Sequence, residues 1–279
     1  FGSRVLIKLM SQIAVPADQH FLDGEAKWEE GDCIGAIDAL RKAVAVDHTN
    51  ARAWFSLANL LANQGEAADA ISAYAKVLEL DCRHVGAFYS LGNCMYGNGD
   101  LVSAKASYRS ALDLEPEHWR ARYNLASILW DQGDLDGAAA EFGRITASDA
   151  SNAKAGKALG RVLEHRGDAV GAAAAYRSVL RADPEQLGAY HGLGNALKAA
   201  GDWGGAELAY RAVLDLDPKH GSANLNLGHA LWHAGKREDA AAAYAAVPAG
   251  GRLSEQARAC LALLREETAS ICCEAHSLH

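Results

Sequence analysis

Residues 187–220 of this chain read LGAYHGLGNALKAAGDWGGAELAYRAVLDLDPKH, and residues 85–118 read VGAFYSLGNCMYGNGDLVSAKASYRSALDLEPEH. The two stretches match in the placement of glycine, alanine and tyrosine, and both end close to a proline. Their common period is 34 residues, and it continues in both directions without insertion or deletion. Starting at Ala17, the period divides the chain into seven blocks: 17–50, 51–84, 85–118, 119–152, 153–186, 187–220 and 221–250.

Each recurring residue has a physical role in a pair of packed helices. Apolar residues at positions 4, 7, 8 and 11 of a block share one face of a helix, because they follow the i, i+3, i+4, i+7 spacing. Glycine at position 15 ends that helix, since it takes left-handed backbone without a Cβ penalty. The next residue is usually Asp, which caps a second helix. Pro116, Pro184 and Pro218 at position 32 prevent the second helix from continuing.

Small residues at positions 8 and 20 allow the two helices to approach closely, and an aromatic residue at position 24 is expected to fill the space between neighbouring hairpins. With seven gapless copies of this pattern, the sequence resembles the tetratricopeptide-repeat (TPR) family. The resemblance covers residues 17 to about 250. Because such hairpins must stack to bury their apolar faces, the expected fold is all-α: a right-handed α–α superhelix of seven hairpins with a C-terminal capping helix.

The ends of the array depart from the repeat. The first block has His20 and Asp23 where apolar residues are expected, and the seventh closes on the sequence VPAGGR. We predict a capping or linking helix over residues 1–16, a capping helix over 251–267, and a disordered tail over 268–279.

Composition limits the classes of function. A net charge of −8 over 279 residues disfavours nucleic acid as a partner. No apolar run approaches the ~18 residues of a membrane-spanning helix, and the first residues do not resemble a signal peptide. The six cysteines do not follow the repeat, which favours a reducing, cytoplasmic setting. Since the chain begins at Phe1, an upstream targeting signal stays open.

The resemblance places positions 2, 5, 6, 9, 12 and 13 of the first helix of each block in a concave groove that takes a peptide of a partner protein. Asparagines recur there, and an amide both donates and accepts hydrogen bonds, so it can hold a peptide backbone without selecting its sequence. Aromatic residues are typical interface anchors, although packing between neighbouring helices is equally expected of them. The candidate groove residues are Arg52, Phe55, Asn59, Tyr89, Asn93, Arg120, Tyr123, Asn124, Lys154, Lys157, Arg161, Asn195, Lys198 and Asn226.

Charge is distributed unevenly along these groove positions. Lys154, Lys157 and Arg161 form one basic stripe, and the middle blocks as a whole are net positive. Like charges on one helix face repel, so the stripe favours an anionic partner, unless it is simply solvated or relieved by Glu164. The clamp with which some TPR domains hold chaperone C-termini is not reproduced, because the residues after Lys157 depart from its pattern. The first block, in contrast, presents only acids: Asp18, Glu25 and Glu29.

No catalytic arrangement is evident. Gly235 and Lys236 lack the upstream glycine of a phosphate-binding loop. His229 and His233 lie at i, i+4, but the glutamate of a zinc-protease motif is absent, and we expect neither a metal ion nor a cofactor. The tail residues match no zinc module: Cys272, Cys273, His276 and His279.

The sequence therefore favours a non-enzymatic scaffold that binds a segment of a partner protein, with an acidic segment as one option. Two alternatives stay open. The chain resembles the TPR regions that target larger enzymes, such as glycosyltransferases or methyltransferases, and also the TPR subunits of envelope assembly or secretion. The full reading frame would discriminate these alternatives from the first interpretation, and self-association remains a further possibility.

Overall fold

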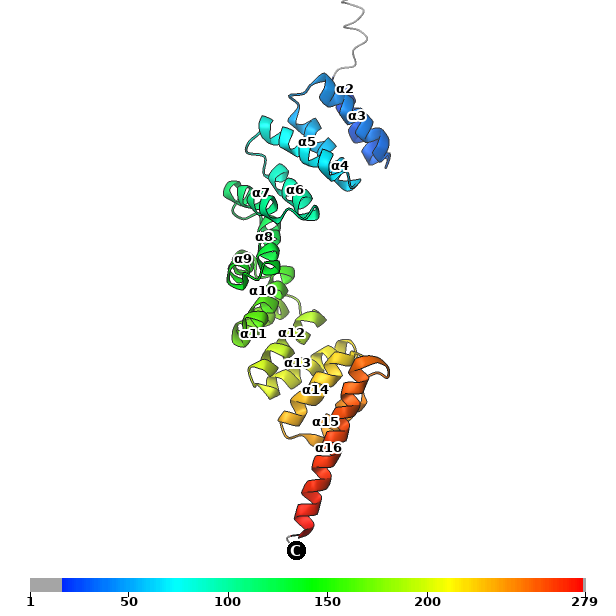
Figure 1. Ribbon diagram of the computed structural model, residues 1–279, viewed down its shortest axis with the longest axis vertical. Coiled ribbons are helices and arrows are strands. Elements are labelled where there is room, and N and C mark those ends of the chain that lie inside the picture. The colour runs from blue at the N-terminus through cyan, green and yellow to red at the C-terminus, as the bar shows by residue number, and fades with distance from the viewer. Residues whose placement is uncertain (1–16, 278–279) are drawn as a thin grey trace, which may run out of the picture. The chain divides into compact units, whose positions relative to one another are not determined.

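The described part of the chain is entirely helical. The computed structural model describes residues 17–277, with side chains described for residues 18–266, and no strand occurs in that range (Figure 1). The helix predicted over residues 1–16 lies outside the described residues. The chain divides into two units within one helix, between Ile128 and Leu129.

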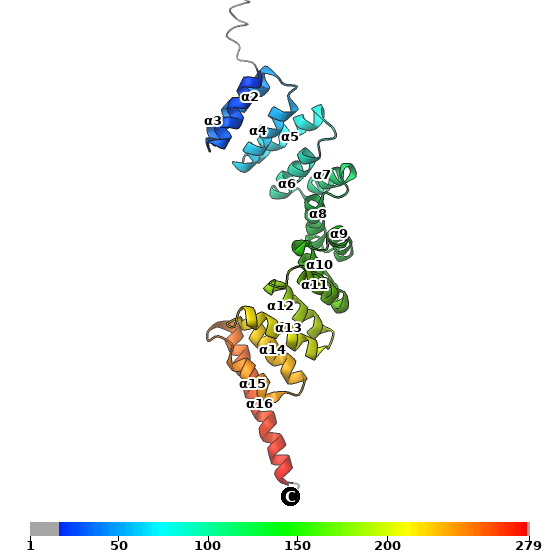
Figure 2. The same ribbon diagram turned by 180° about the vertical axis from the view of Figure 1, so that it is seen from behind.

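In each unit, consecutive helices pair as hairpins, as the two opposite views show (Figures 1 and 2). The N-terminal unit contains α2 (Ala17–Glu29), α3 (Cys33–Val46), α4 (Ala51–Asn63), α5 (Ala67–Leu80), α6 (Val85–Gly97), α7 (Leu101–Leu114) and most of α8 (Trp119–Asp131). The C-terminal unit continues with α9 (Leu135–Ser148), α10 (Ala153–Arg166), α11 (Ala169–Ala182), α12 (Leu187–Ala199), α13 (Trp203–Leu216), α14 (Gly221–His233), α15 (Arg237–Ala245) and α16 (Gly251–Ser277).

Every hairpin turns on a glycine, as the repeat predicts. The φ angles of these glycines lie between 78° and 83°, in the left-handed region that other residues adopt only with strain. In five hairpins the following aspartate accepts a hydrogen bond from the backbone N–H three residues later and so caps the second helix. These aspartates are Asp32, Asp100, Asp134, Asp168 and Asp202.

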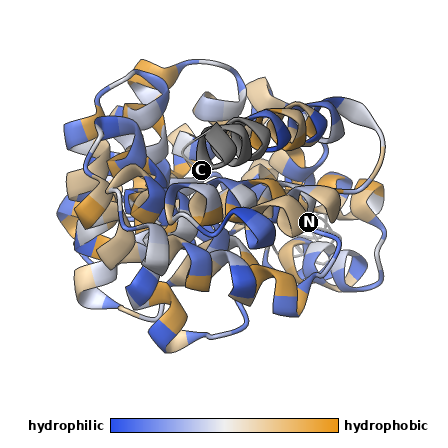
Figure 3. Cartoon of the chain, turned by 90° about the horizontal axis from the view of Figure 1, so that it is seen from below, coloured by the Kyte–Doolittle hydropathy of each residue, from blue (hydrophilic) through white to orange (hydrophobic). Residues whose placement is uncertain are grey.

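The two helices of a hairpin are spaced by a contact between a small residue and an aromatic ring. Tyr108 and Tyr210, at position 24, are fully buried. A Cβ added to Gly92 or to Gly194, at position 8, would lie 2.6 Å from the ring of the tyrosine in the same repeat. The glycine therefore allows the tyrosine ring to lie flat between the helices. Figure 3 shows hydrophobic and hydrophilic residues interspersed along the helices that are visible from this side.

The core differs in one respect from the predicted stripe. Position 3 is a fully buried alanine in six repeats: Ala53, Ala87, Ala121, Ala155, Ala189 and Ala223. This recurring alanine is visible in the sequence, although the predicted core stripe of positions 4, 7, 8 and 11 does not include it. Position 4 was predicted as core, but Trp54 at this position of the second repeat is only half-buried. Nε1 of Trp54 donates a hydrogen bond to the carbonyl of His48 at 3.0 Å, which connects α4 to the preceding repeat.

The C-terminal end departs most from the expected pattern. α15 has nine residues where the other second helices have fourteen, and positive φ occurs at Gly250 and at Gly251, the first residue of α16. α16 packs on α14 and α15 and buries Ala257 and Leu264. It continues to Ser277, ten residues beyond the end predicted at 267. Residues 268–277 contain neither glycine nor proline to end a helix.

Replacing a turn glycine should destabilise the array locally. We expect Gly201→Val to lower the free energy of unfolding by about 1–3 kcal/mol, because valine is forced into left-handed backbone. Gly204→Ala is the control, since its backbone is helical and the nearest atom to an added Cβ lies 4.0 Å away. It should stabilise the protein by about 0.5 kcal/mol. Urea unfolding followed by circular dichroism measures both, and equal midpoints for the two variants would contradict the assignment of Gly201 as a hairpin turn.

Candidate functional site

The predicted groove residues all lie on first helices of the hairpins. They are Arg52, Phe55 and Asn59 on α4, Tyr89 and Asn93 on α6, Arg120, Tyr123 and Asn124 on α8, Lys154, Lys157 and Arg161 on α10, Asn195 and Lys198 on α12, and Asn226 on α14. The structure divides them between the two units, which are described separately.

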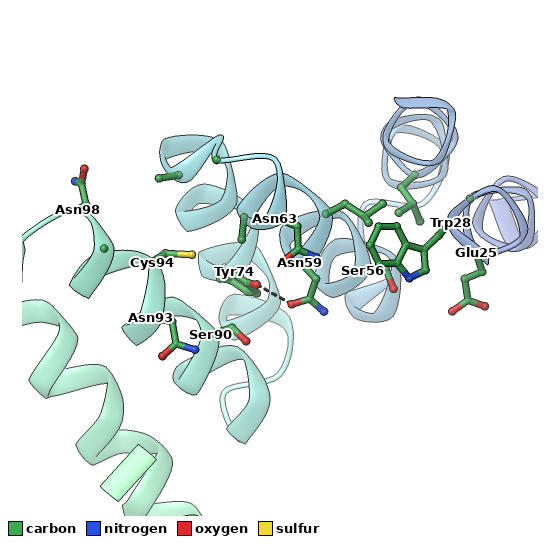
Figure 4. A pocket seen from close by; sticks show the side chains of 17 residues that line it. Glu25, Trp28, Ser56, Asn59, Asn63, Tyr74, Ser90, Asn93, Cys94 and Asn98 are labelled. Atoms are coloured by element: carbon green, nitrogen blue, oxygen red, sulfur yellow. Dashed lines mark hydrogen bonds between the residues drawn. The ribbon is translucent and has the colours of Figure 1, made fainter. Parts of the chain in front are cut away.

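A hollow of about 880 Å³ lies in the N-terminal unit against α2, α4 and α6 (Figure 4). This volume falls within the ~300–1,000 Å³ typical of ligand sites. Its polar lining consists mainly of neutral side chains, and Glu25 is the single charged residue among those that line it. Trp28, beside Glu25 on α2, supplies an indole. The neutral polar side chains of the lining are Ser56, Asn59, Asn63, Tyr74, Ser90, Asn93 and Asn98.

Buried tyrosines orient two of these amides. The hydroxyl of Tyr74 donates to Oδ1 of Asn59 at 2.7 Å, as Figure 4 shows. The hydroxyl of Tyr108 donates to Oδ1 of Asn93 at 2.8 Å, and Nδ2 of Asn124 donates to the same oxygen at 2.9 Å. Burial raises the pKa of Tyr74 and of Tyr108 to about 12, so both hydroxyls keep their protons. Because the amide oxygens are occupied, Asn59 and Asn93 are left with their Nδ2 donors.

The same arrangement recurs in the C-terminal unit. The hydroxyl of Tyr210 donates to Oδ1 of Asn195 at 2.8 Å, and Nδ2 of Asn226 approaches the same oxygen at 3.3 Å. Nζ of Lys198 in turn donates to Oδ1 of Asn226 at 2.9 Å. A chain of hydrogen bonds therefore connects the core tyrosine to the half-buried Lys198.

The pairing of tyrosine with asparagine was missed in the sequence, although a signal for it exists. The second, third and sixth repeats carry both Asn at position 9 and Tyr at position 24. The fourth repeat carries Ser127 and Phe142 at these positions, and phenylalanine has no hydroxyl to donate. The correspondence is incomplete, because the fifth and seventh repeats keep Tyr176 and Tyr244 at position 24 but carry Arg161 and His229 at position 9.

Two of the predicted aromatic anchors pack between repeats. The ring of Phe55 lies 4.5 Å from that of His84, and the ring of Tyr89 lies 5.0 Å from that of His118. Both histidines accept a backbone N–H through Nδ1 at the start of the next first helix. These contacts agree with the second alternative for the aromatic residues, which was packing within the array, whereas a contact of Phe55 or Tyr89 with a ligand stays a prediction.

The basic residues contact neutral groups. The guanidinium of Arg161 lies 5.2 Å above the ring of Trp130, and Nζ of Lys157 donates to Oε1 of Gln186 at 2.8 Å. In the N-terminal unit, Arg52 lies over the ring of Phe21 and Arg120 over that of Trp119. Of the remaining candidates, Tyr123 is half-buried and Lys154 is exposed.

Glu164 is an acid in a half-buried position of the C-terminal unit. Its Oε2 accepts a hydrogen bond from the hydroxyl of Tyr176 at 3.0 Å, whereas Oε1 is buried and accepts none. Burial raises the pKa of Glu164, although the hydrogen bond from Tyr176 and the charge of Arg161 oppose the rise.

The two histidines considered as metal ligands are engaged elsewhere. The ring of His233 stacks on that of Trp203 at 4.2 Å, and Nε2 of His229 lies 3.6 Å from Sγ of Cys260. Among the described residues, no three His, Cys, Asp or Glu side chains are grouped to hold a metal ion. The cysteines and histidines of the tail lie outside the described side chains. Within the described range, no helix is both long and apolar enough to cross a membrane.

Comparison with known proteins identifies the repeat. Two family models, both described as tetratricopeptide repeat, match residues 95–162 and residues 21–82 and 191–257. No curated protein matches the sequence.

Solved structures share the fold at low sequence identity. The C-terminal part of a TPR repeat-containing protein from Cytophaga hutchinsonii has a TM-score of 0.73 at 15% identity, over 85% of this chain and 98% of that one. A tetratricopeptide repeat protein from Parabacteroides merdae has a TM-score of 0.59 at 16% identity, over 89% and 98%. YrrB, a TPR protein with an unusual peptide-binding site, has a TM-score of 0.58 at 24% identity, over 72% and 100%.

The half-buried Glu164 gives a prediction for pH. An acid with a raised pKa binds its proton more tightly in the folded state, so the stability cost of Glu164 is greatest at neutral pH and is relieved as the pH falls through that raised value. We expect Glu164→Gln to raise the melting temperature at neutral pH, and this gain should disappear by about pH 4. The exposed Glu185→Gln should change neither value. A lower melting temperature for Glu164→Gln at neutral pH would show that the charged form is stabilising.

Proposed function

Since the matching family models cover more than half of its length, the chain belongs to the tetratricopeptide-repeat family, and we propose that it holds an extended peptide segment of a partner protein on the concave faces of its two units. Repeat proteins of this family generally act as non-enzymatic scaffolds for protein partners. The fold shared with YrrB is one on which a peptide-binding site occurs. The finer proposal rests on the side chains of this chain.

The observation that carries it is the orientation of the groove amides. Asn59, Asn93 and Asn195 each give their oxygen to a tyrosine hydroxyl, so each has an N–H donor left for another molecule. The carbonyl groups of a peptide backbone are the complementary acceptors, and each such bond contributes about 0.5–1.5 kcal/mol. Contacts of this kind hold a peptide without selecting its side chains.

Exchanging donors for acceptors tests this role with little disturbance of the fold. In Asn59→Asp/Asn93→Asp, the carboxylate still accepts from Tyr74 and Tyr108, but the Nδ2 donor becomes an oxygen. Against peptides first selected on the wild type from a random library, we expect about tenfold weaker binding by fluorescence anisotropy, the equivalent of two lost hydrogen bonds. The melting temperature should stay close to that of the wild type.

The matched control adds the same charge to the same hollow. Asn63 and Asn98 also line it, and both are exposed, so Asn63→Asp/Asn98→Asp changes the electrostatics without removing an oriented donor. Equal losses of affinity in the two double variants would attribute the effect to charge and overturn the role of the amides. Full binding by Asn59→Asp/Asn93→Asp would do the same.

We propose further that the C-terminal unit favours an acidic segment. Lys157 and Lys198 donate to neutral amide oxygens, and Arg161 lies over an indole, so these contacts leave much of their positive charge uncompensated. Glu164 neutralises part of it, since the charge of Arg161 acts on its pKa. A peptide carboxylate would gain charge-assisted hydrogen bonds from these side chains.

Reversing two charges tests this preference. We expect Lys157→Glu/Arg161→Glu to bind glutamate-rich peptides at least about tenfold more weakly than the wild type, because each attraction becomes a repulsion. Wild-type binding should weaken between about 50 and 300 mM NaCl, as screening predicts. Arg177→Glu/Arg181→Glu makes the same charge change at exposed positions on α11 and should have little effect. Equal losses in both double variants would indicate an effect of net charge alone.

A further inference from the structure

Glu25 and Trp28 form one end of the hollow in the N-terminal unit. They lie three residues apart on α2, and residues at this spacing are neighbours on a helix surface. Both line the hollow, and Trp28 is 45% exposed, which is unusual for so large an apolar side chain. Figure 4 shows both side chains beside Ser56 of α4. An indole and a carboxylate are therefore presented together at an open surface.

The carboxylate of Glu25 has no counter-ion within the part of the chain that the structure describes. On the same helix, Nζ of Lys27 is engaged by Asp23 at 2.9 Å. On the facing helix, Arg52 lies over the ring of Phe21. Glu25 itself makes no ion pair or side-chain hydrogen bond with any described residue, and the other polar groups of the hollow are neutral.

This arrangement matches the chemistry of a cationic side chain. A cation within about 6 Å of an indole centroid is attracted to the ring face, and a carboxylate beside the ring adds a charge–charge attraction. The aliphatic part of a lysine or arginine can pack along apolar surface while its charged group reaches the carboxylate. Leu40 and Leu60 supply such surface in the same hollow.

We propose that this end of the hollow binds a lysine or arginine side chain of the partner segment, between the indole of Trp28 and the carboxylate of Glu25. The proposal rests on the proposed function, because the same hollow holds the peptide backbone through Asn59 and Asn93. It adds a preference that the amides cannot supply. The N-terminal unit then favours a basic residue, whereas the C-terminal unit favours an acidic segment.

The test uses the full chain and four peptides of one otherwise neutral sequence, selected on the wild type as above. The peptides differ at a single position, which carries lysine, arginine, acetyl-lysine or glutamate. Acetyl-lysine keeps the length of lysine and removes its charge. We expect the lysine and arginine peptides to bind the wild type about five- to tenfold more tightly than the acetyl-lysine peptide, as measured by fluorescence anisotropy.

Variants assign the effect to the two side chains. In Glu25→Gln the ratio of the affinity for the lysine peptide to that for the acetyl-lysine peptide should fall to nearly one. In Trp28→Leu this ratio should be about threefold smaller than in the wild type. The control is Glu30→Gln, an exposed acid that does not line the hollow, and it should preserve the full advantage. Each comparison is a ratio within one variant, so a loss of stability does not imitate the expected result.

Each outcome separates the two proposals. Equal affinity of the wild type for the lysine and acetyl-lysine peptides, with binding still reduced in Asn59→Asp/Asn93→Asp, would overturn the cation site and leave the proposed function standing. Survival of the lysine advantage in Glu25→Gln would also overturn it. Failure to select any peptide that binds the wild type would overturn the proposed function itself.

Discussion

The contact between a small residue at position 8 and a tyrosine at position 24 is the constraint on which much of this structure depends. Glycine at position 8 allows the ring of Tyr108 or Tyr210 to lie between the two helices of its hairpin. In that place the ring fills the core, while its hydroxyl donates to a half-buried asparagine of the first helix. One side chain therefore sets the spacing of the helices and the orientation of a surface amide, so the stability of the hairpin and the geometry of the groove are linked.

The sequence predicted the fold well because the turn glycine repeats seven times at a constant spacing and the other contacts recur in most of the repeats. The turn glycines and the capping aspartates follow from local backbone chemistry, and they appear where the period places them. The contacts of individual side chains were harder to predict. The ring of Phe55 packs against His84, which lies 29 positions later in the sequence. His84 ends the same block and caps α6 of the next repeat, so this contact could not be predicted from the helix that carries Phe55. The extent of α16 was also underestimated, because its last residues carry no periodic pattern yet contain nothing that ends a helix.

In the candidate site, too, helix periodicity could be read from the sequence, whereas contacts between residues far apart in the sequence could not. Helix periodicity placed the asparagines on one face of the first helices but did not show which atom of each amide is available. That depends on the tyrosine fifteen residues later, and therefore on tertiary packing. Likewise, the basic stripe was visible in the sequence, but only the structure shows that Lys157 donates to Gln186 and that Arg161 lies over Trp130. The hollow around Glu25 requires three repeats to form.

The pairing of positions 9 and 24 also bears on how such a chain changes through evolution. Asparagine and tyrosine bond within one 34-residue block, so the block carries both the recognising group and the residue that orients it. Duplication of a block copies the bonded pair, and replacement of the pair, as by Ser127 and Phe142 in the fourth repeat, removes this hydrogen bond from one block. The amides of Asn124 and Asn226, which reach back to Asn93 and Asn195, link these two pairs to the following block, so the order of the blocks matters as well as their number.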